Sequence, residues 1–452
     1  MSLPQPQPFL PVAQLCRQSD STINTPNIPK ILLRFICFNH LYPPGWYSCF
    51  FLFFVHRIIP DADCVLQNYK NKGINRLSLH NLFTLSALPK KILIAPLDWG
   101  LGHTTRCLPV IAALLQEGHT VVAAADGAPA SILKAQFPGL QILPLKGYNI
   151  RYGRNANMFM PKLLLQVPKI IGRIIYEHRW LKQVQALHQF DIIISDNRYG
   201  LYHPALTSII MTHQVQILSG MGRLADKVLL SRHRKMLEHF HQCWVVDDAT
   251  KGLSGILAHP AIMPANATYI GPLSQFMRYT ATGTAGDHCL VLLSGPEPMR
   301  SQLEHILWLQ CCALTDYRFV FIAGNIKGTV PDHCPAHIQY YPYLGGAALQ
   351  QAMTNARLVI CRSGYSTLMD LDYLQKPAIL IPTPGQTEQE YLARYWADSG
   401  RAVQYTQDNI QLEAGLRHIY NKHHNIPSET RTDHSGNTLK ALSLWLQQQL
   451  YK

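Results

Sequence analysis

The sequence predicts two α/β domains in tandem, each a parallel sheet covered by helices. From Lys90 onward, apolar runs of four to six residues alternate with helical patterns, and the alternation restarts near residue 289 after a segment of small, turn-forming residues. Such runs are typical of strands buried on both faces. The length of 452 residues suffices for two or three domains, and a composition of 47% hydrophobic and 15% charged residues favours packed cores over disorder.

The strands and helices can be placed along the chain from these runs. In the first domain we expect strands at 92–95, 120–124, 140–143, 191–195, 208–211 and 243–246, with helices at 108–116, near 129–136 and over roughly 158–188. In the second we expect strands at 289–293, 319–323, 358–361 and 378–381. Open parallel sheets bind ligands at the carboxyl ends of their strands, so the loops after these strands are the candidate sites.

The domain boundaries follow from the same patterns. We expect an N-terminal extension at 1–89, a first domain at 90–272, a linker at 273–287, a second domain at 288–425 and a C-terminal tail or helix at 426–452. The extension contains the apolar run Trp46–Val55, about half the length needed to cross a bilayer. We interpret it as a poorly ordered or spurious extension, and the alternative is a segment that touches a membrane.

Charge and cysteine content narrow the functional classes. The net charge is +13, which favours an anionic partner such as a phosphorylated substrate or an acidic lipid surface. No arginine-rich run or nucleic-acid-binding motif is present, so we do not expect a nucleic acid partner. The 11 cysteines show no CxxC pair and no zinc-like spacing, which indicates reduced thiols and no metal site.

The loop after the first strand carries the best candidate for acid–base chemistry. Gly100 and Gly102 permit a tight turn before a helix, and His103 and Arg106 follow at its start. A histidine there can act as a general base for an acceptor hydroxyl, and the alternative is a local helix cap. Asp196, after the fourth strand, would orient His103 if both loops open on one crevice; its alternative is a helix N-cap.

In the second domain, two loops have the features of phosphate sites. Ser294-Gly295 follows the first strand, and Arg362-Ser363-Gly364 follows the strand at 358–361 and precedes a helix. Helix starts of this kind present free N–H groups to anions. Asp370, nearly two helical turns further on, could accept hydrogen bonds from two vicinal ribose hydroxyls.

Arg362-Ser363-Gly364, Thr367, Asp370, Pro382 and Gln389 together resemble the C-terminal domain of glycosyltransferase family 28, which includes the transferase that makes lipid II. The resemblance covers about residues 90–420 and is strongest in 289–402. It implies a GT-B fold, in which two Rossmann-like domains enclose a cleft. It also implies a UDP-sugar donor, inversion at the anomeric carbon, no cofactor and no essential metal.

The resemblance also assigns roles by matching position. Asp370 would hold the ribose, and Ser363-Gly364 with Ser294-Gly295 would face the diphosphate. Tyr343 and Leu344 would border the uracil, and Glu388 and Gln389 would meet the donor sugar. Gly102 and His103 match the glycine loop of the family's N-terminal domain. The predicted donor-binding set is Gly102, Ser294, Gly295, Tyr343, Leu344, Arg362, Ser363, Gly364, Asp370, Glu388 and Gln389, and the predicted catalytic pair is His103 and Asp196.

The acceptor side is indicated by residues 158–182, which mix apolar and basic side chains. Such a helix suits an anionic membrane and a lipid-linked acceptor, and the alternative is an ordinary amphipathic helix that covers the sheet. We therefore expect a cytoplasmic enzyme, peripheral on the inner face of the membrane. It would transfer a hexose or N-acetylhexosamine from a UDP-sugar to a lipid-linked or envelope glycan. The alternatives are a UDP-sugar 2-epimerase and a non-catalytic nucleotide-sugar-binding subunit.

Overall fold

A computed structural model of the protein describes residues 89–150, 165–218, 222–250, 252–279, 286–423 and 437–450. All of them belong to one compact unit, Leu88–Lys452. Residues 1–88 of the predicted extension and residues 158–164 of the predicted acceptor helix lie outside the described residues.

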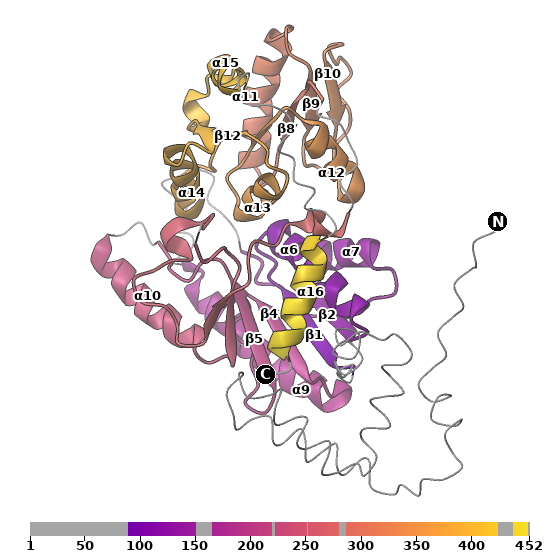
Figure 1. Cartoon of the computed structure of the whole chain (residues 1–452), viewed down its shortest axis with the longest axis vertical. Helices are drawn as coiled ribbons and strands as arrows, with labels where there is room; N and C mark the ends of the chain where they lie inside the picture. The colour runs from indigo at the N-terminus through magenta and orange to yellow at the C-terminus, as the bar shows by residue number, and fades with distance from the viewer. Residues whose placement is uncertain are drawn as a thin grey trace, which may run out of the picture. The chain divides into compact units, whose positions relative to one another are not determined.

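The first half of this unit is built on a seven-stranded sheet in which every strand pair is parallel (Figure 1). Its strands are β1 (Lys91–Pro96), β2 (Thr120–Ala125), β3 (Gln141–Pro144), β4 (Ile192–Asp196), β5 (Thr207–Thr212), β6 (Gln242–Val245) and β7 (Ala267–Tyr269), in the order β3-β2-β1-β4-β5-β6-β7. The helices are α6 (Leu101–Gln116), α7 (Gly127–Gln136), α9 (Val167–His188) and α10 (Arg223–Leu237).

The second half repeats this plan with a six-stranded parallel sheet in the order β10-β9-β8-β11-β12-β13. Its strands are β8 (Cys289–Leu292), β9 (Phe319–Ile322), β10 (Ile338–Tyr341), β11 (Leu358–Cys361), β12 (Ala378–Leu380) and β13 (Ala402–Gln404). The helices are α11 (Met299–Ala313), α12 (Gly346–Asn355), α13 (Tyr365–Tyr373), α14 (Thr387–Asp398), α15 (Leu412–His423) and α16 (Asn437–Leu450).

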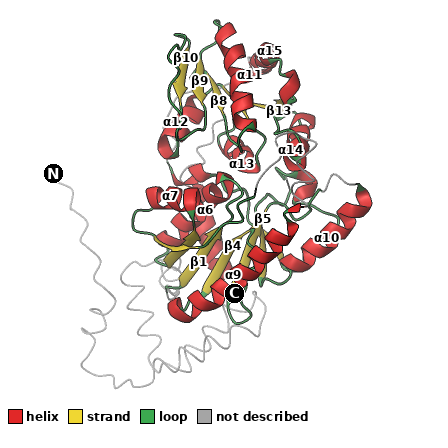
Figure 2. Cartoon of the chain, turned by 180° about the vertical axis from the view of Figure 1, so that it is seen from behind, coloured by secondary structure: helices red, strands yellow, loops and turns green. Residues whose placement is uncertain are grey.

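The central strands are buried on both faces, as their apolar runs predict. In β1, Ile92 and Ile94 pack into one cluster of buried side chains, and Leu93 and Ala95 pack into another. Successive side chains of a strand point to opposite faces, so each face of β1 contributes to a separate core layer. Helices cover both faces of this sheet: α6 contributes to the first cluster and α9 to the second (Figure 2).

The strand order places the candidate loops next to one another. In the first sheet, the chain order reverses at β1, which lies between β2 and β4, and Pro96 at the end of β1 pairs with Asp196 at the end of β4. In the second sheet, β8 occupies the equivalent position between β9 and β11. Ligand sites of open parallel sheets form where the strand order reverses, outside the carboxyl ends.

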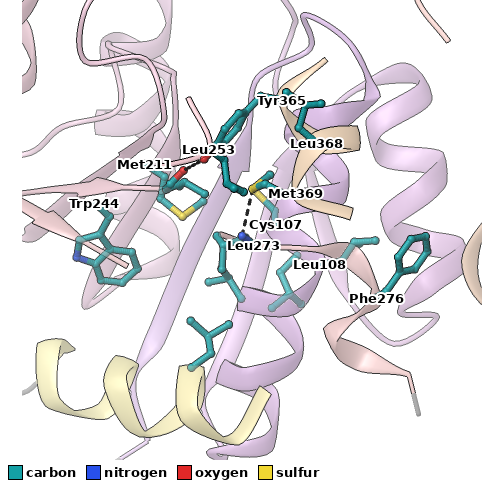
Figure 3. Packing of buried hydrophobic residues seen from close by; sticks show 14 of the residues in the cluster. Cys107, Leu108, Met211, Trp244, Leu253, Leu273, Phe276, Tyr365, Leu368 and Met369 are labelled. Atoms are coloured by element: carbon teal, nitrogen blue, oxygen red, sulfur yellow. Dashed lines mark hydrogen bonds between the residues drawn. The ribbon is translucent and has the colours of Figure 1, made fainter. Parts of the chain in front are cut away.

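A shared core joins the two halves (Figure 3). Cys107 and Leu108 of α6 belong to the same buried cluster as Leu368 and Met369 of α13. The Leu273 N–H, in the segment that connects the halves, points at the Met369 sulfur over 3.1 Å. The connecting segment is therefore held against both halves.

Helix α16 returns from the second half to the first and packs against α6. Trp445 meets Trp244 of β6 edge-on, with ring centroids 5.1 Å apart, and the Ser443 hydroxyl donates to the Glu117 carboxylate. The sequence predicted this segment only as a tail or helix. Its apolar face covers part of the first domain's core.

The sequence analysis missed three edge strands, and among the helices it did not place are α10 and the short helix η3. Strands β7, β10 and β13 are sheet edges of three or four residues with half-exposed side chains, so they lack a continuous apolar run. The predicted linker at 273–287 contains the 3-10 helix η3 (Gln275–Arg278), which begins at the Ser274 side-chain cap. The predicted helix at 158–188 is observed, in its described part, as α9.

The packing of α16 leads to a stability prediction. Leu446 is 1% exposed in the shared core, so Leu446→Ala should lower the free energy of unfolding by about 2–4 kcal/mol, as expected for a large-to-small core change. Leu444 lies on the same helix but is 52% exposed, so Leu444→Ala should change stability by less than about 0.5 kcal/mol. Urea unfolding of both variants would measure the difference. Equal effects would show that α16 does not pack as described.

Candidate active site

The first-half site forms where β1, β4 and β5 end. Helix α6 starts just after β1, and Asp196 is the last residue of β4, paired in register with the end of β1. His213 follows β5 directly. His103 and Arg106, on the first turns of α6, therefore face the same edge of the sheet as Asp196 and His213.

The structure brings the predicted catalytic pair together. The Nδ1 atom of His103 lies 3.2 Å from Oδ1 of Asp196, and the Asp196 side chain is fully buried. Arg106 binds the same carboxylate, with Nε donating to Oδ2 over 2.7 Å and an NH2 group donating to Oδ1. Asp196 is not the N-cap of a helix, which was its alternative interpretation.

Asp196 and Arg106 both face the same nitrogen of His103, so two proton arrangements are possible. The NH2 group of Arg106 lies 2.9 Å from the same His103 Nδ1 atom that faces Asp196. When Nδ1 carries the proton, it donates to Asp196 and leaves the Nε2 lone pair free to accept a proton. When Nδ1 is unprotonated, it accepts from Arg106, and Nε2 then carries the proton. Only the first arrangement makes Nε2 a general base.

The electrostatics of the pair suit a neutral base beside an ionised partner. Burial lowers the pKa of His103 below its ordinary value, Arg106 acts in the same direction, and Asp196 opposes them. Burial alone would raise the pKa of Asp196, but Arg106 and then His103 outweigh it and hold that pKa well below its usual range. His103 is therefore held neutral near neutral pH, while Asp196 stays ionised.

His213 connects this site to the second half. Arg106 NH1 lies 2.9 Å from His213 Nδ1, and because a guanidinium only donates, Nδ1 accepts and the proton lies on Nε2. That Nε2 donates to Oε1 of Glu388, on the first turn of α14, over 2.8 Å. His213 also stacks flat on Tyr365 with ring centroids 4.1 Å apart. The Tyr365 hydroxyl donates to the Val246 carbonyl over 2.6 Å (Figure 3).

Gly102 lies where the two halves approach most closely around the site. A Cβ atom on Gly102 would collide with the Ser366 side chain on the first turn of α13. The start of α6 therefore meets the start of α13, and neither helix has a side-chain cap. Uncapped helix starts offer unpaired N–H groups and a partial positive charge, which favours a bound anion.

Most of the predicted donor-binding residues surround the same edge of the second sheet. Ser294 and Gly295 are exposed after β8, and Gly364 caps α13 with open space beside it. The Ser363 hydroxyl donates to the Gln389 backbone carbonyl over 2.8 Å. Further away, Tyr343 is 39% exposed, and Leu344 packs against the shared core.

Two predicted donor-binding residues have their side chains committed elsewhere. Arg362 is 1% exposed, and its NH1 and NH2 groups donate to the carbonyls of Ile381, Pro382 and Met299 and to the Gln407 side chain. Burial lowers its pKa to about 10. The prediction that Arg362 contacts the donor is corrected on this geometry: it tethers the surrounding loops instead of presenting its charge to the cleft.

Asp370 is 5% exposed, and its carboxylate accepts three hydrogen bonds from the connecting segment. The Ser274 hydroxyl donates over 2.6 Å, and Gln275 donates through its side chain over 2.7 Å and its backbone N–H over 3.2 Å. Burial raises the pKa of Asp370 to about 6 against these hydrogen bonds. In this conformation the carboxylate therefore binds η3, and its predicted ribose role requires that segment to give way.

His213 and Tyr365 were not predicted from the sequence, although one signal could have found the first. His213 directly follows the strand at 207–212, the same position relative to its strand that drew attention to Asp196. Arg106 was noted only for its place at a helix start. Among the described residues, no group of three or more His, Cys, Asp or Glu side chains is arranged to hold a metal ion.

Comparison with known proteins shows similarity to glycosyltransferases. Residues 310–443 match the model of the glycosyltransferase family 28 C-terminal domain. A protein of Exiguobacterium sibiricum, named UDP-N-acetylglucosamine--N-acetylmuramyl-(pentapeptide) pyrophosphoryl-undecaprenol N-acetylglucosamine transferase, is 27% identical over 213 residues, 43% of this chain and 53% of the relative. The protein of that name from Desulforudis audaxviator is 47% identical over 85 residues, 18% of this chain and 22% of the relative. The chain thus matches about half or less of the length of these relatives.

Solved structures show the same architecture. The kitacinnamycin glycotransferase matches 80% of this chain and 95% of its own length with a TM-score of 0.54, and the calicheamicin glycosyltransferase CalG4 matches 80% and 94% with a TM-score of 0.51. Each is 13% identical to this chain, so these likenesses concern the fold. The chain has a GT-B fold. It is a family 28-like protein that resembles the lipid II-forming transferase, as its motifs predicted.

The buried Arg106–Asp196 pair leads to a prediction about stability and pH. Asp196→Asn leaves the Arg106 guanidinium, which is 3% exposed, without its counter-ion, so the free energy of unfolding at pH 7 should fall by about 3–5 kcal/mol. The folded pKa of Asp196 lies below its unfolded value of 3.8, so its stabilisation is present above that value and is lost as the pH falls through the folded pKa. The gap between wild type and variant should therefore stay constant from about pH 7 to 5 and narrow below about pH 4.

Asp98→Asn is the matched control, because Asp98 also follows β1 but, among the described residues, accepts only from the backbone N–H groups of Tyr148 and Asn149. Its loss should be less than half that of Asp196→Asn. Equal losses, measured by urea unfolding across the same pH range, would contradict a special role for the buried ion pair.

Proposed function

We propose that the protein is a glycosyltransferase that moves a hexose or N-acetylhexosamine from a UDP-sugar to a hydroxyl of a lipid-linked or envelope glycan. The observation that carries the proposal is the contact of His103 with Asp196, at an edge of the first sheet that meets the second half through Glu388. A neutral histidine with an ionised partner is the arrangement that activates a hydroxyl nucleophile.

The proposed reaction divides between the two halves. The acceptor hydroxyl gives its proton to Nε2 of His103 while its oxygen forms a bond to the anomeric carbon of the donor sugar. The bond from that carbon to the diphosphate breaks on the opposite side, so the configuration inverts. The proton makes His103 an imidazolium, which the Asp196 carboxylate stabilises from 3.2 Å away.

The leaving diphosphate needs compensation for its growing negative charge. We place it at the start of α13, beside Ser294-Gly295, where uncapped N–H groups and the helix dipole supply that compensation without an essential metal. Glu388 and Gln389 would meet the sugar, and Tyr343 and Leu344 would border the uracil. Asp370 would hold the ribose after exchanging its hydrogen bonds with η3 for the two ribose hydroxyls.

The comparisons support the proposed donor site and suggest which substrates to test first. The match to the family 28 C-terminal domain covers residues 310–443, most of the second half, where the donor is proposed to bind. The Exiguobacterium relative is named for a UDP-N-acetylglucosamine donor and an undecaprenol-linked acceptor. A UDP-sugar and a lipid-linked acceptor are therefore the first substrates to test.

Helix α9 carries a surface that suits such an acceptor. Val167, Ile171 and Ile175 are 40%, 52% and 48% exposed and recur every four residues, so they form one apolar stripe. Arg179 and Lys182, four and seven residues after Ile175, continue the same exposed face of the helix. An apolar stripe with basic neighbours suits an anionic bilayer surface, and we propose that the protein works at the inner face of the cytoplasmic membrane. No helix in the described ranges has the length and hydropathy of a membrane span.

The catalytic role of His103 is tested by its removal. His103→Ala should lower turnover with the best UDP-sugar by about 10²–10⁴-fold, the scale of a lost general base, with unchanged UDP affinity. In the wild type, kcat/KM should fall at acid pH with a midpoint below the ordinary histidine pKa of 6.5, because the base must be neutral and its pKa is lowered. This acid limb should be absent in the residual activity of the variant.

His305→Ala serves as the control, since His305 is exposed on α11 and should affect neither turnover nor the pH profile. Loss of UDP binding in His103→Ala with normal turnover at saturation would make His103 a donor ligand. The base would then have to be another residue, and Asp98 would be tested next.

The membrane surface has its own test. Ile171→Ser combined with Ile175→Ser should reduce sedimentation with vesicles of phosphatidylglycerol and phosphatidylcholine several-fold, because two apolar side chains no longer enter the interface. Leu309→Ser, at a residue of α11 that is 57% exposed, is the control and should bind as the wild type does. Equal binding by all three proteins would exclude this stripe as the docking surface.

A further inference from the structure

Three loops leave the centre of the second sheet side by side. Cys361 at the end of β11 pairs with Leu292 of β8 on one side and with Leu380 of β12 on the other. The loops that follow these strands therefore emerge next to one another at the carboxyl edge. The resemblance to family 28 assigns phosphate contacts to the first two loops, Ser294-Gly295 and Ser363-Gly364. It includes Pro382 of the third loop in its motif but gives no role to Thr383.

The backbone of Thr383 is held firmly by its neighbours. Its N–H donates to the Gln389 side chain over 2.9 Å, and its carbonyl accepts from the Gln386 N–H over 3.0 Å. Gln389 also accepts the Ser363 hydroxyl at its backbone carbonyl, so one residue ties Thr383 to the loop after β11. This arrangement fixes the position of the Thr383 side chain without using its hydroxyl.

Within the described part of the chain, that hydroxyl has no hydrogen-bond partner, although the residue is only 2% exposed. Buried hydroxyl groups are almost always paired, because an unpaired one loses its hydrogen bonds to water without replacement. An unpaired hydroxyl at the carboxyl edge of a parallel sheet is therefore a candidate ligand contact.

Gly295 of the first loop lies close to the hydroxyl. Gly295 has a φ of +112°, and a Cβ atom built on it would lie 4.0 Å from Thr383 Oγ1. A Cβ atom on Gly364 would have no heavy atom within 4 Å. Gly364 is also the N-cap of α13, which has no side-chain cap. The hydroxyl and the uncapped helix start thus both follow neighbouring strands at the same carboxyl edge.

The carboxylates nearest in sequence are turned to other partners. Glu388 accepts from His213 over 2.8 Å, and Glu390 accepts from the Gly385 N–H over 2.8 Å. Glu297 is bound by Arg300 and Ser301. Hydrogen-bond donors without opposing carboxylates are what a phosphate group requires.

We propose that the Thr383 hydroxyl donates a hydrogen bond to a phosphate oxygen of the bound nucleotide diphosphate, at a site completed by Gly295 and the start of α13. This assignment rests on the proposed function for the uridine part of the ligand, whereas the phosphate contact depends only on the geometry above. Removal of the Thr383 hydroxyl should weaken the binding of ligands that carry a phosphate group and leave the binding of uridine unchanged.

The experiment compares Thr383→Val, which replaces the hydroxyl by a methyl group of similar size, with Thr383→Ser, which keeps it. Titration calorimetry with UDP should show affinity about 10- to 100-fold weaker for Thr383→Val, the range for a hydrogen bond to a charged group, and near wild type for Thr383→Ser. Affinity for uridine should be the same in all three proteins. Thr354→Val removes another buried, unpaired hydroxyl on α12 and should leave UDP affinity unchanged.

Folding is checked with the same proteins without ligand. Thr383→Val removes an unpaired buried hydroxyl, so its urea midpoint should equal or exceed that of the wild type. Wild-type affinity of Thr383→Val for UDP, or an equal loss of uridine binding, would overturn the proposal. If the wild type binds neither UDP nor uridine, the proposed function fails at its donor. Inorganic pyrophosphate is then the probe for the phosphate contact. The contact is supported if pyrophosphate raises the melting temperature of the wild type but not that of Thr383→Val. Any other result overturns it.

Discussion

The buried ion pair between Arg106 and Asp196 is the interaction on which the arrangement of the candidate active site depends. Both side chains are almost completely buried, so removing either charge would leave the other buried without a counter-ion, which is strongly destabilising. Their contact attaches α6 to the end of β4. It thereby fixes where His103, one turn earlier on the same helix, lies relative to the end of β4. The guanidinium has a further NH group for His213, so both histidines are held by one cation.

This cation also influences what each histidine can do. Arg106 fixes the proton of His213 on Nε2, where it donates to Glu388 of the second half. At His103, burial and Arg106 favour the neutral form, whereas Asp196 favours the charged form. A base must be neutral before the reaction and stabilised as a cation during it, and a buried imidazole between these opposite charges meets both conditions. The same contacts bring the base near the donor half, because His213 also stacks on Tyr365 at the start of α13.

The sequence predicted the two-domain fold because the central strands are uninterrupted apolar runs, which need no tertiary information to be recognised. It missed β7, β10 and β13 because an edge strand is covered on fewer sides and carries polar residues. It singled out His103 and Asp196 as candidates because both follow strands at the carboxyl edge. It assigned Arg362 to the donor because a motif shows which residues are shared, not where a side chain points. The contact of His213 with Glu388 joins residues 175 apart, and no local pattern encodes that pairing.

The two halves are proposed to contribute different chemical groups, because proton transfer and stabilisation of a leaving diphosphate have different requirements. The first half concentrates titratable groups at its sheet edge, where burial and one arginine adjust their proton affinity. The second half presents backbone N–H groups and hydroxyls around glycines, whose charge state does not vary with pH. Proton transfer needs groups that titrate near neutral pH, whereas a leaving diphosphate needs fixed dipoles that are already oriented before charge develops. Gly102 lies where these two environments touch, since its missing side chain allows the start of α6 to reach the start of α13. A side chain at position 102 would push the start of α6 away from the start of α13 and so separate the proposed base from the proposed leaving group. The proposed reaction requires that these two groups lie next to each other.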